Sequence, residues 1–264
     1  MTVHCLVFDI ETVPDLDLGR RLYDLDGVED NQVAQIMFTR RRQETGGEFL
    51  SLVQHRIVAI SVALRTRESL RVWSLGEPQS SEKELIERFF DGIEKYSPDL
   101  VSWNGSGFDL PVLQYRALRH GVAAPRYWET GDDDQAFRYN NYLNRFHWRH
   151  LDLMDVLSGY QSRGRASLED VAALLGLPGK VGMHGEEVWA HYRAGDLLAI
   201  RDYCEIDVIN TYLIYLRFEL IRGRLMPSEY ERELAYTREC LSAQAKPHFA
   251  RFLESWGAGA SAGS

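Results

Sequence analysis

The chain has 264 residues, 45% of them hydrophobic, which is enough for one large domain with a substantial core. Its three cysteines are scattered without a Cys-x-x-Cys pair and suggest neither a disulfide framework nor a zinc site, so a cytoplasmic protein is expected. The sequence has no basic leader ahead of an apolar run and no long uncharged apolar stretch, so we expect neither secretion nor a membrane span.

Three strands are predicted in the first part of the chain. Val3–Ile10 is a nearly continuous apolar run, as expected of a central strand that is buried on both faces. Arg56–Leu64 and Leu70–Leu75 are two further strands, and Arg65–Ser69 is the turn between them. These three strands would begin one sheet.

Helices and short strands are predicted to alternate after this point. Ser81 and Glu84 resemble a capping box that opens a helix ending near Tyr96. The next expected elements are, in chain order, a strand at Asp99–Trp103, a helix from Leu110-Pro111 to Gly121, a strand at Leu151–Leu157, a short helix from Ser167 to Gly176, a long helix from Asp196 to Arg222 and a final helix from Pro227 to Trp256. Residues 257–264 contain only Gly, Ala and Ser and are expected to be a disordered tail.

This order predicts an α/β fold with a mixed five-stranded sheet, helices on its flanks and the first strand at its centre. We expect a single domain over residues 1–256 with its core at 3–222. Two stretches, Leu18–Gln54 after the first strand and Val122–Arg149 before the fifth, are predicted to be insertions at the rim of the sheet. Insertions of this kind commonly carry binding functions.

Two acids stand on the first predicted strand. Asp9 and Glu11 are two residues apart, so their side chains project from the same face. A polar strand end that runs into a turn at Thr12–Asp15 would also explain them.

A second group of polar residues follows the fourth strand. Asp109 stands just before Leu110-Pro111 and is interpreted either as a helix N-cap or as a metal ligand. Asn104 could simply turn the chain, with Gly105 and Gly107 allowing unusual backbone angles.

A third group lies on the long helix. Tyr203 and Asp207 are spaced i, i+4 and share one helix face, although a core tyrosine beside a surface aspartate is the alternative interpretation. The four acids, two on the first strand, one after the fourth strand and one on the long helix, can converge at one edge of the sheet. Such a cluster without an obligatory cationic partner is stable only if it binds metal ions, which predicts phosphoester chemistry.

These motifs resemble those of the DEDD 3′–5′ exonucleases that carry a tyrosine in the third motif, on a ribonuclease-H-like fold. The greatest resemblance is to the proofreading exonuclease domain of family-B DNA polymerases and to the stand-alone predicted 3′–5′ exonucleases related to it. It covers roughly Val3 to Arg222 and depends on Phe8-Asp9-Ile10-Glu11-Thr12, Asn104-x3-Phe108-Asp109-Leu110-Pro111 and Tyr203-Cys204-x2-Asp207. The stretch from Ser167 to Lys180 also resembles the stand-alone group.

The resemblance implies a reaction and a role for each residue. A terminal phosphodiester of single-stranded nucleic acid, DNA favoured over RNA, would be hydrolysed from the 3′ end to nucleoside monophosphates. Two Mg²⁺ or Mn²⁺ ions would be bound by Asp9, Glu11, Asp109 and Asp207. Tyr203 would position the attacking water. The last nucleotides and their phosphates would contact Thr12, Asn104, Phe108 and Lys180.

A nucleic-acid partner must be reconciled with a net charge of −9. Four acids that bound two divalent cations would leave a charge of −5 elsewhere. The stretch between Gln135 and Leu151 holds Arg138, Arg145 and Arg149 and no acid, and aromatic residues alternate with them. This pattern favours backbone neutralisation with base stacking. The alternative is an aromatic insertion that packs on the main domain and exposes its arginines to solvent.

Two other functions remain open at this stage. One is an endonuclease of the ribonuclease H type, against which the tyrosine at position 203 argues. The other is a non-catalytic nucleic-acid-binding domain that kept the fold. The loss of an acid would have favoured that function, and none is missing.

Overall fold

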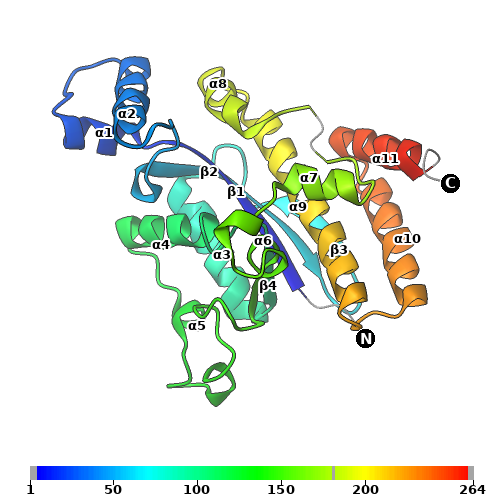
Figure 1. Ribbon diagram of the computed structural model, residues 1–264. Coiled ribbons are helices and arrows are strands. Elements are labelled where there is room, and N and C mark those ends of the chain that lie inside the picture. The colour runs from blue at the N-terminus through cyan, green and yellow to red at the C-terminus, as the bar shows by residue number, and fades with distance from the viewer. Residues whose placement is uncertain (1–4, 180–181, 261–264) are drawn as a thin grey trace.

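A computed structural model describes residues 5–179 and 182–260 of the chain. Its five strands form one sheet in the order β3-β2-β1-β4-β5 (Figure 1). The central strand β1 is antiparallel to β2 and parallel to β4, while β2–β3 is antiparallel and β4–β5 is parallel. The strands are β1 Cys5–Pro14, β2 His55–Arg65, β3 Leu70–Ser74, β4 Asp99–Ser102 and β5 His150–Asp152. The predicted mixed five-stranded sheet with the first strand at its centre is therefore confirmed.

Helices cover both faces of this sheet, with α9, α10 and α11 on one side and α3 and α4 on the other (Figure 1). The α-helices are α1 Leu16–Tyr23, α2 Asp30–Thr45, α3 Glu82–Tyr96, α4 Asp109–His120, α5 Pro125–Trp128, α6 Leu153–Leu157, α7 Leu168–Leu174, α8 Val188–Arg193, α9 Leu197–Ile221, α10 Pro227–Ala243 and α11 Pro247–Ala260. None of the helices in the described part of the chain has the length and apolar character needed to span a membrane.

The side chains of β1 alternate between two cores. Cys5 and Val7 pack with the apolar face of α9, whereas Phe8 and Ile10 pack with α3 and α4. This period of two follows from the strand geometry. Asp9 follows Cys5 and Val7 in this alternation, so its side chain points toward α9.

The first strand is longer than predicted. It continues past Ile10 to Pro14 because Glu11 pairs with Ala59 and Thr12 with Ile57 on β2, with a bulge between Glu11 and Thr12. Val3 lies outside the described residues. The polar residues after Ile10 are thus part of the sheet and not a turn.

Several predicted helix ends are confirmed by their caps. Ser81 accepts a hydrogen bond from the backbone N–H of Glu84 at the start of α3, and Ser167 caps α7 in the same way through Asp170. Gly121 ends α4 with φ of 65°, a left-handed conformation that glycine adopts at little cost. Local capping chemistry was therefore a reliable guide at these positions.

The fifth strand was predicted too long. The strand ends at Asp152, and Leu153–Leu157 forms the short helix α6. The carboxylate of Asp152 accepts a hydrogen bond from the backbone N–H of Asp155, which makes Asp152 the N-cap of this helix. The apolar run Leu151–Leu157 did not distinguish a strand from a strand followed by a helix.

The predicted final helix is two helices. Ala245 has φ of 50°, which ends α10, and Pro247 begins α11 because it lacks the N–H that a continuous helix would need. Helix α11 continues to Ala260, so residues 257–260 are helical and not the predicted tail. Residues 261–264 lie outside the described residues.

The two predicted insertions carry helices at opposite ends of the molecule. The first contains α1 and α2 at the top of Figure 1, and the second contains α5 at the bottom. Buried Leu50 packs with Val33 and Met37 in a small core of the first insertion.

Candidate active site

Four predicted ligands line one cleft of about 320 Å³. Asp9 and Glu11 come from β1, Asp109 from the start of α4 and Asp207 from α9. Asn104 and Phe108 line the same cleft. The four acids therefore meet beside β1, beyond the end of its pairing with β4 at Val101, where α4 and α9 both reach the cleft.

Asp109 is held by the central strand. It is the first residue of α4, whose N-cap is Phe108, so the interpretation of Asp109 as an N-cap is wrong. Its Oδ1 accepts a hydrogen bond of 3.1 Å from the backbone N–H of Ile10. This hydrogen bond holds the Asp109 carboxylate against β1 at Ile10, the residue between Asp9 and Glu11.

The turn before Asp109 is organised by Asp152. The two carboxylate oxygens of Asp152 accept hydrogen bonds of 2.9 Å from the backbone N–H groups of Asn104 and Ser106. Asn104 has φ of 64°, which confirms its role in turning the chain. Asp152 was not among the predicted site residues, although an aspartate three residues before Asp155 is a recognisable N-cap pattern.

The glycines of this turn serve close packing. Neither Gly105 nor Gly107 has a positive φ, contrary to the expectation of unusual backbone angles. A Cβ at Gly105 would lie 2.2 Å from Ser102 Oγ, and one at Gly107 would lie 2.5 Å from Asn104 Oδ1. A larger residue at either position would therefore displace the side chain of Ser102 or Asn104.

Helix α9 contributes three neighbouring groups to the site. Tyr203 and Asp207 share one face, and Cys204 between them lies against β1. The Cys204 thiol donates to the Asp9 carbonyl oxygen at 3.4 Å and lies 3.5 Å from Asp9 Oδ2. One ligand atom each from Asp9, Glu11 and Cys204 lies within 4.8 Å of the others. Cys204 was also not among the predicted site residues.

The site concentrates negative charge. Burial raises the pKa of Asp9 well above its usual value, and the charges of Asp109, Glu11 and Asp207 raise it further. Burial also raises the pKa of Asp109 to about 7. Burial, followed by the charge of Asp207, raises the pKa of Tyr203 far above its usual value, so its hydroxyl stays protonated.

The donor set fits hard divalent cations. No lysine or arginine is among the described residues that line the cleft. Carboxylate oxygens are the ligands that Mg²⁺ and Mn²⁺ prefer. Burial raises the pKa of Cys204 well above its usual value, so this group is a thiol that donates a hydrogen bond and not a thiolate ligand.

A larger groove of about 1130 Å³ continues from the cleft. The cleft and the groove share Ile10, Glu11, Phe108 and Glu169 as lining residues. Thr12, a predicted substrate contact, lines the groove, and its Oγ1 is 2.8 Å from His55 Nδ1.

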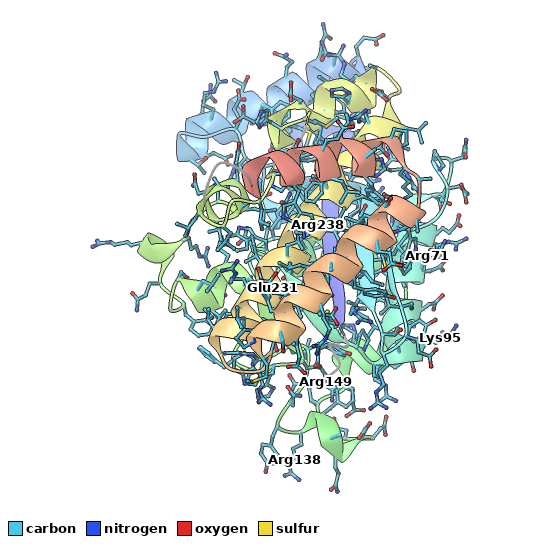
Figure 2. The ribbon with its side chains drawn as sticks, turned by 90° about the vertical axis from the view of Figure 1, so that its right-hand side faces the viewer. Arg71, Lys95, Arg138, Arg149, Glu231 and Arg238 are labelled. Atoms are coloured by element: carbon cyan, nitrogen blue, oxygen red, sulfur yellow. The ribbon has the colours of Figure 1, made fainter. Side chains whose placement is uncertain are left out.

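The three predicted arginines have different surroundings. Arg145 forms an ion pair of 2.7 Å with buried Asp155. Arg149 donates to the Asn140 carbonyl at 2.6 Å and stacks 3.8 Å above the Phe137 ring centroid. Figure 2 shows Arg138 and Arg149 toward the lower end of the molecule, the end opposite α1 and α2. Lys180 lies outside the described residues.

Fold and site together define an α/β domain with a mixed five-stranded sheet and a carboxylate cleft that suits divalent cations. The chain belongs to the family described as predicted 3′–5′ exonucleases related to the exonuclease domain of PolB, which it matches over residues 47–256. This confirms the resemblance inferred from the motifs.

Polymerases are among the curated relatives of the chain. A DNA polymerase of Archaeoglobus fulgidus is 25% identical over 175 residues, which are 65% of this chain and 20% of the polymerase. The catalytic polypeptide of DNA polymerase epsilon from Schizosaccharomyces pombe is 24% identical over 142 residues, which are 51% of this chain and 6% of that polypeptide. The chain thus spans a fifth or less of these relatives.

A solved structure of the family B DNA polymerase from Pyrobaculum calidifontis is 18% identical to the chain, with a TM-score of 0.48. The match covers 80% of this chain and 24% of the polymerase. The family match includes Asp109, Tyr203 and Asp207 but begins after Asp9 and Glu11. The structure brings those two acids into the same cleft as the others.

Proposed function

We propose that this chain is a metal-dependent 3′–5′ exonuclease that hydrolyses terminal phosphodiester bonds of single-stranded nucleic acid, DNA in preference to RNA, to nucleoside monophosphates. The observation that carries the proposal is the convergence of Asp9, Glu11, Asp109 and Asp207 in one cleft beside Tyr203. Membership of the exonuclease-related family supports the same reaction.

The four carboxylates would bind two Mg²⁺ or Mn²⁺ ions. Bound divalent cations stabilise the charge on the attacking and leaving oxygens of a phosphoester displacement. General acid–base catalysis supplies only about 3–5 kcal/mol of a barrier reduction that reaches roughly 23 kcal/mol for slow hydrolyses. Binding and positioning by the carboxylates therefore have to contribute most of the effect.

Tyr203 is suited to orienting the attacking water. Its pKa is raised because the group is buried and faces Asp207, so the hydroxyl keeps its proton and can hold a water molecule by hydrogen bonding. It is not suited to act as a general base, because it would have to ionise first.

The substrate contacts belong to the same proposal. Thr12, Asn104 and Phe108 would contact the last nucleotides, and Lys180 a phosphate. Arg145 lines a cavity with Ser106 and Gly107 of the turn that carries Asn104, which supports its contact with the incoming strand. Arg138 and Arg149 would meet the strand farther from the cleft.

The three cysteines are unpaired, in keeping with a cytoplasmic protein.

A 5′-labelled single-stranded DNA oligonucleotide with Mg²⁺ or Mn²⁺ tests the reaction. We expect a ladder that shortens from the 3′ end and disappears with Asp109→Asn, which keeps the side-chain volume but removes the charge. Asp133→Asn, in an exposed turn, is the matched control and should retain activity.

Other products would overturn the proposal. Cuts in a circular single strand would indicate an endonuclease. Metal-dependent binding without shortening would indicate a non-catalytic nucleic-acid-binding domain.

A further inference from the structure

The first insertion supplies an aromatic side chain beside the candidate active site. Phe49 follows α2 and lines the large groove together with His55 and Phe108. The Phe49 ring centroid is 5.2 Å from that of His55 and 5.4 Å from that of Phe108. His55 and Phe108 are 5.0 Å apart at an interplanar angle of 84°. The three rings, called the aromatic triad below, form one continuous surface.

The backbone of Phe49 is fixed although its ring is exposed. The next residue, Leu50, is buried in the core of the insertion, and Arg41 Nε donates to the Phe49 carbonyl at 2.8 Å. The side chain of Phe49 nevertheless remains 65% exposed. Single exposed apolar residues are common, but an anchored ring that extends an aromatic cluster next to a cleft offers a surface for stacking.

The negative charge of the groove favours an uncharged base over a phosphate there. The acids Glu169 and Glu186 line it, and its described lining residues include no lysine or arginine. Two further acids line it as well: Glu48 pairs with Arg42, and Glu11 is a proposed metal ligand. A continuing phosphodiester chain would be repelled by these acids, whereas an uncharged base would not. The groove therefore suits the end of a strand, where no further phosphate follows.

We propose that the aromatic triad of Phe49, His55 and Phe108 is a subsite that stacks the 3′-terminal nucleobase of the substrate. The groove that holds the triad shares Glu11 and Phe108 with the carboxylate cleft, so a base stacked there belongs to the nucleotide next to the bond at the acids. This inference rests on the proposed exonuclease function and adds to it a role for the first insertion.

The test compares two DNA oligonucleotides that differ only at the 3′ end, one with a normal terminal nucleotide and one with an abasic terminal nucleotide. Base–aromatic stacking contributes about 1–3 kcal/mol per base. The loss of one stacking ring should therefore lower kcat/KM by about 5- to 150-fold. We expect Phe49→Ala to lose this factor on the normal end and to equal the wild type on the abasic end.

Two further variants make the result specific. Phe49→Trp preserves a stacking ring and should restore the preference for the normal end. Tyr96→Ala removes another exposed aromatic ring, at the end of α3, and should leave both rates unchanged. Equal rates for Phe49→Ala and wild type on the normal end, or equal losses on both ends, would overturn the subsite.

A binding measurement separates this inference from the proposed function. In the Asp109→Asn background, an oligonucleotide ending in 2-aminopurine should lose fluorescence when its terminal base stacks, and Phe49→Ala should abolish the quenching. If the wild type shortens no substrate, the proposed function fails, but the subsite stands or falls by this quenching. If quenching persists in Phe49→Ala, the subsite is overturned whatever the activity.

Discussion

Individual carboxylates in this chain have different roles because different groups donate to them. Asp152 accepts backbone N–H groups of Asn104, Ser106 and Asp155, so its charge is used to shape a turn. Asp109 accepts the N–H of Ile10 and otherwise faces the cleft, where burial raises its pKa to about 7. Both residues are buried aspartates, but only the second is placed to bind a cation.

Asp152→Asn tests the positioning role. The amide has one accepting oxygen where the carboxylate has two, so a buried N–H of the turn loses its partner at a cost of about 1–3 kcal/mol. We expect that loss in urea unfolding, together with a lower rate of oligonucleotide shortening because Asn104 and Phe108 shift. Asp133→Asn is again the control. Unchanged stability and rate would show that the turn does not depend on Asp152.

The residue roles could be predicted only where the signal was local. Spacing placed Asp9 with Glu11 and Tyr203 with Asp207. The contact of Asp109 with Ile10 spans 99 positions, and no local pattern contains it. Cys204 and Phe49 gave no signal for the same reason, since their relevance comes from what the fold brings beside them.

At the scale of elements, buried charges connect α1, α3 and α4. Arg116 on α4 forms ion pairs of 2.5 Å with Asp15, the N-cap of α1, and with Glu82 in the first turn of α3. All three side chains are at most 5% exposed. The first insertion is thereby joined to the helices beneath the sheet, near the groove that it helps to form.

Arg116→Met should be strongly destabilising, because it removes the buried guanidinium that Asp15 and Glu82 share. The removal of one member of a buried pair costs about 3–5 kcal/mol in the free energy of unfolding. Arg119→Met is the matched control: Arg119 is 32% exposed and 3.7 Å from Asp15, so its loss should cost less than about 1 kcal/mol. Urea unfolding measures both, and similar losses would contradict a specific role for Arg116.

The same pair predicts a pH dependence. Burial opposes ionisation of Asp15, but the hydrogen bonds from Arg116 and Leu18 and the charges of Arg116 and Arg119 together outweigh it and lower the pKa of this carboxyl. An acid with a lowered pKa stabilises the fold above its unfolded value of about 3.9 and loses that contribution as the pH falls below it. The difference in stability between wild type and Arg116→Met should therefore shrink in acid.

Most elements could be predicted because their patterns are local. The apolar strands, the serine caps and the glycine stop at Gly121 depend on neighbouring residues. The predicted end of the fifth strand is wrong because pairing with β4, and no local pattern, decides that β5 ends at Asp152. The break at Ala245 does have a local mark in the sequence, because Pro247 cannot continue a helix.

At the scale of the whole molecule, folding brings together acids that are far apart in a chain of net charge −9. In the absence of cations their mutual repulsion and their burial both oppose the folded state, as the raised pKa values of Asp9 and Asp109 indicate. Ligands that bind only the folded state stabilise it by mass action. The acidic cleft should therefore make the stability of the protein depend on both metal and pH.

The last prediction concerns this linkage. An acid whose folded pKa is raised binds more protons in the folded state, so metal-free stability should fall as the pH rises from about 4 to about 7. Asp109→Asn removes that contribution. In EDTA, its free energy of unfolding should rise relative to that of the wild type by up to about 4 kcal/mol between about pH 4 and pH 7. Mn²⁺ at pH 7.5 should raise the Tm of wild type and have a much smaller effect on the variant. Thermal unfolding at several pH values checks both. Parallel pH profiles in EDTA would show that burial does not raise the pKa of Asp109. Equal Mn²⁺ shifts would show that Asp109 is not a metal ligand.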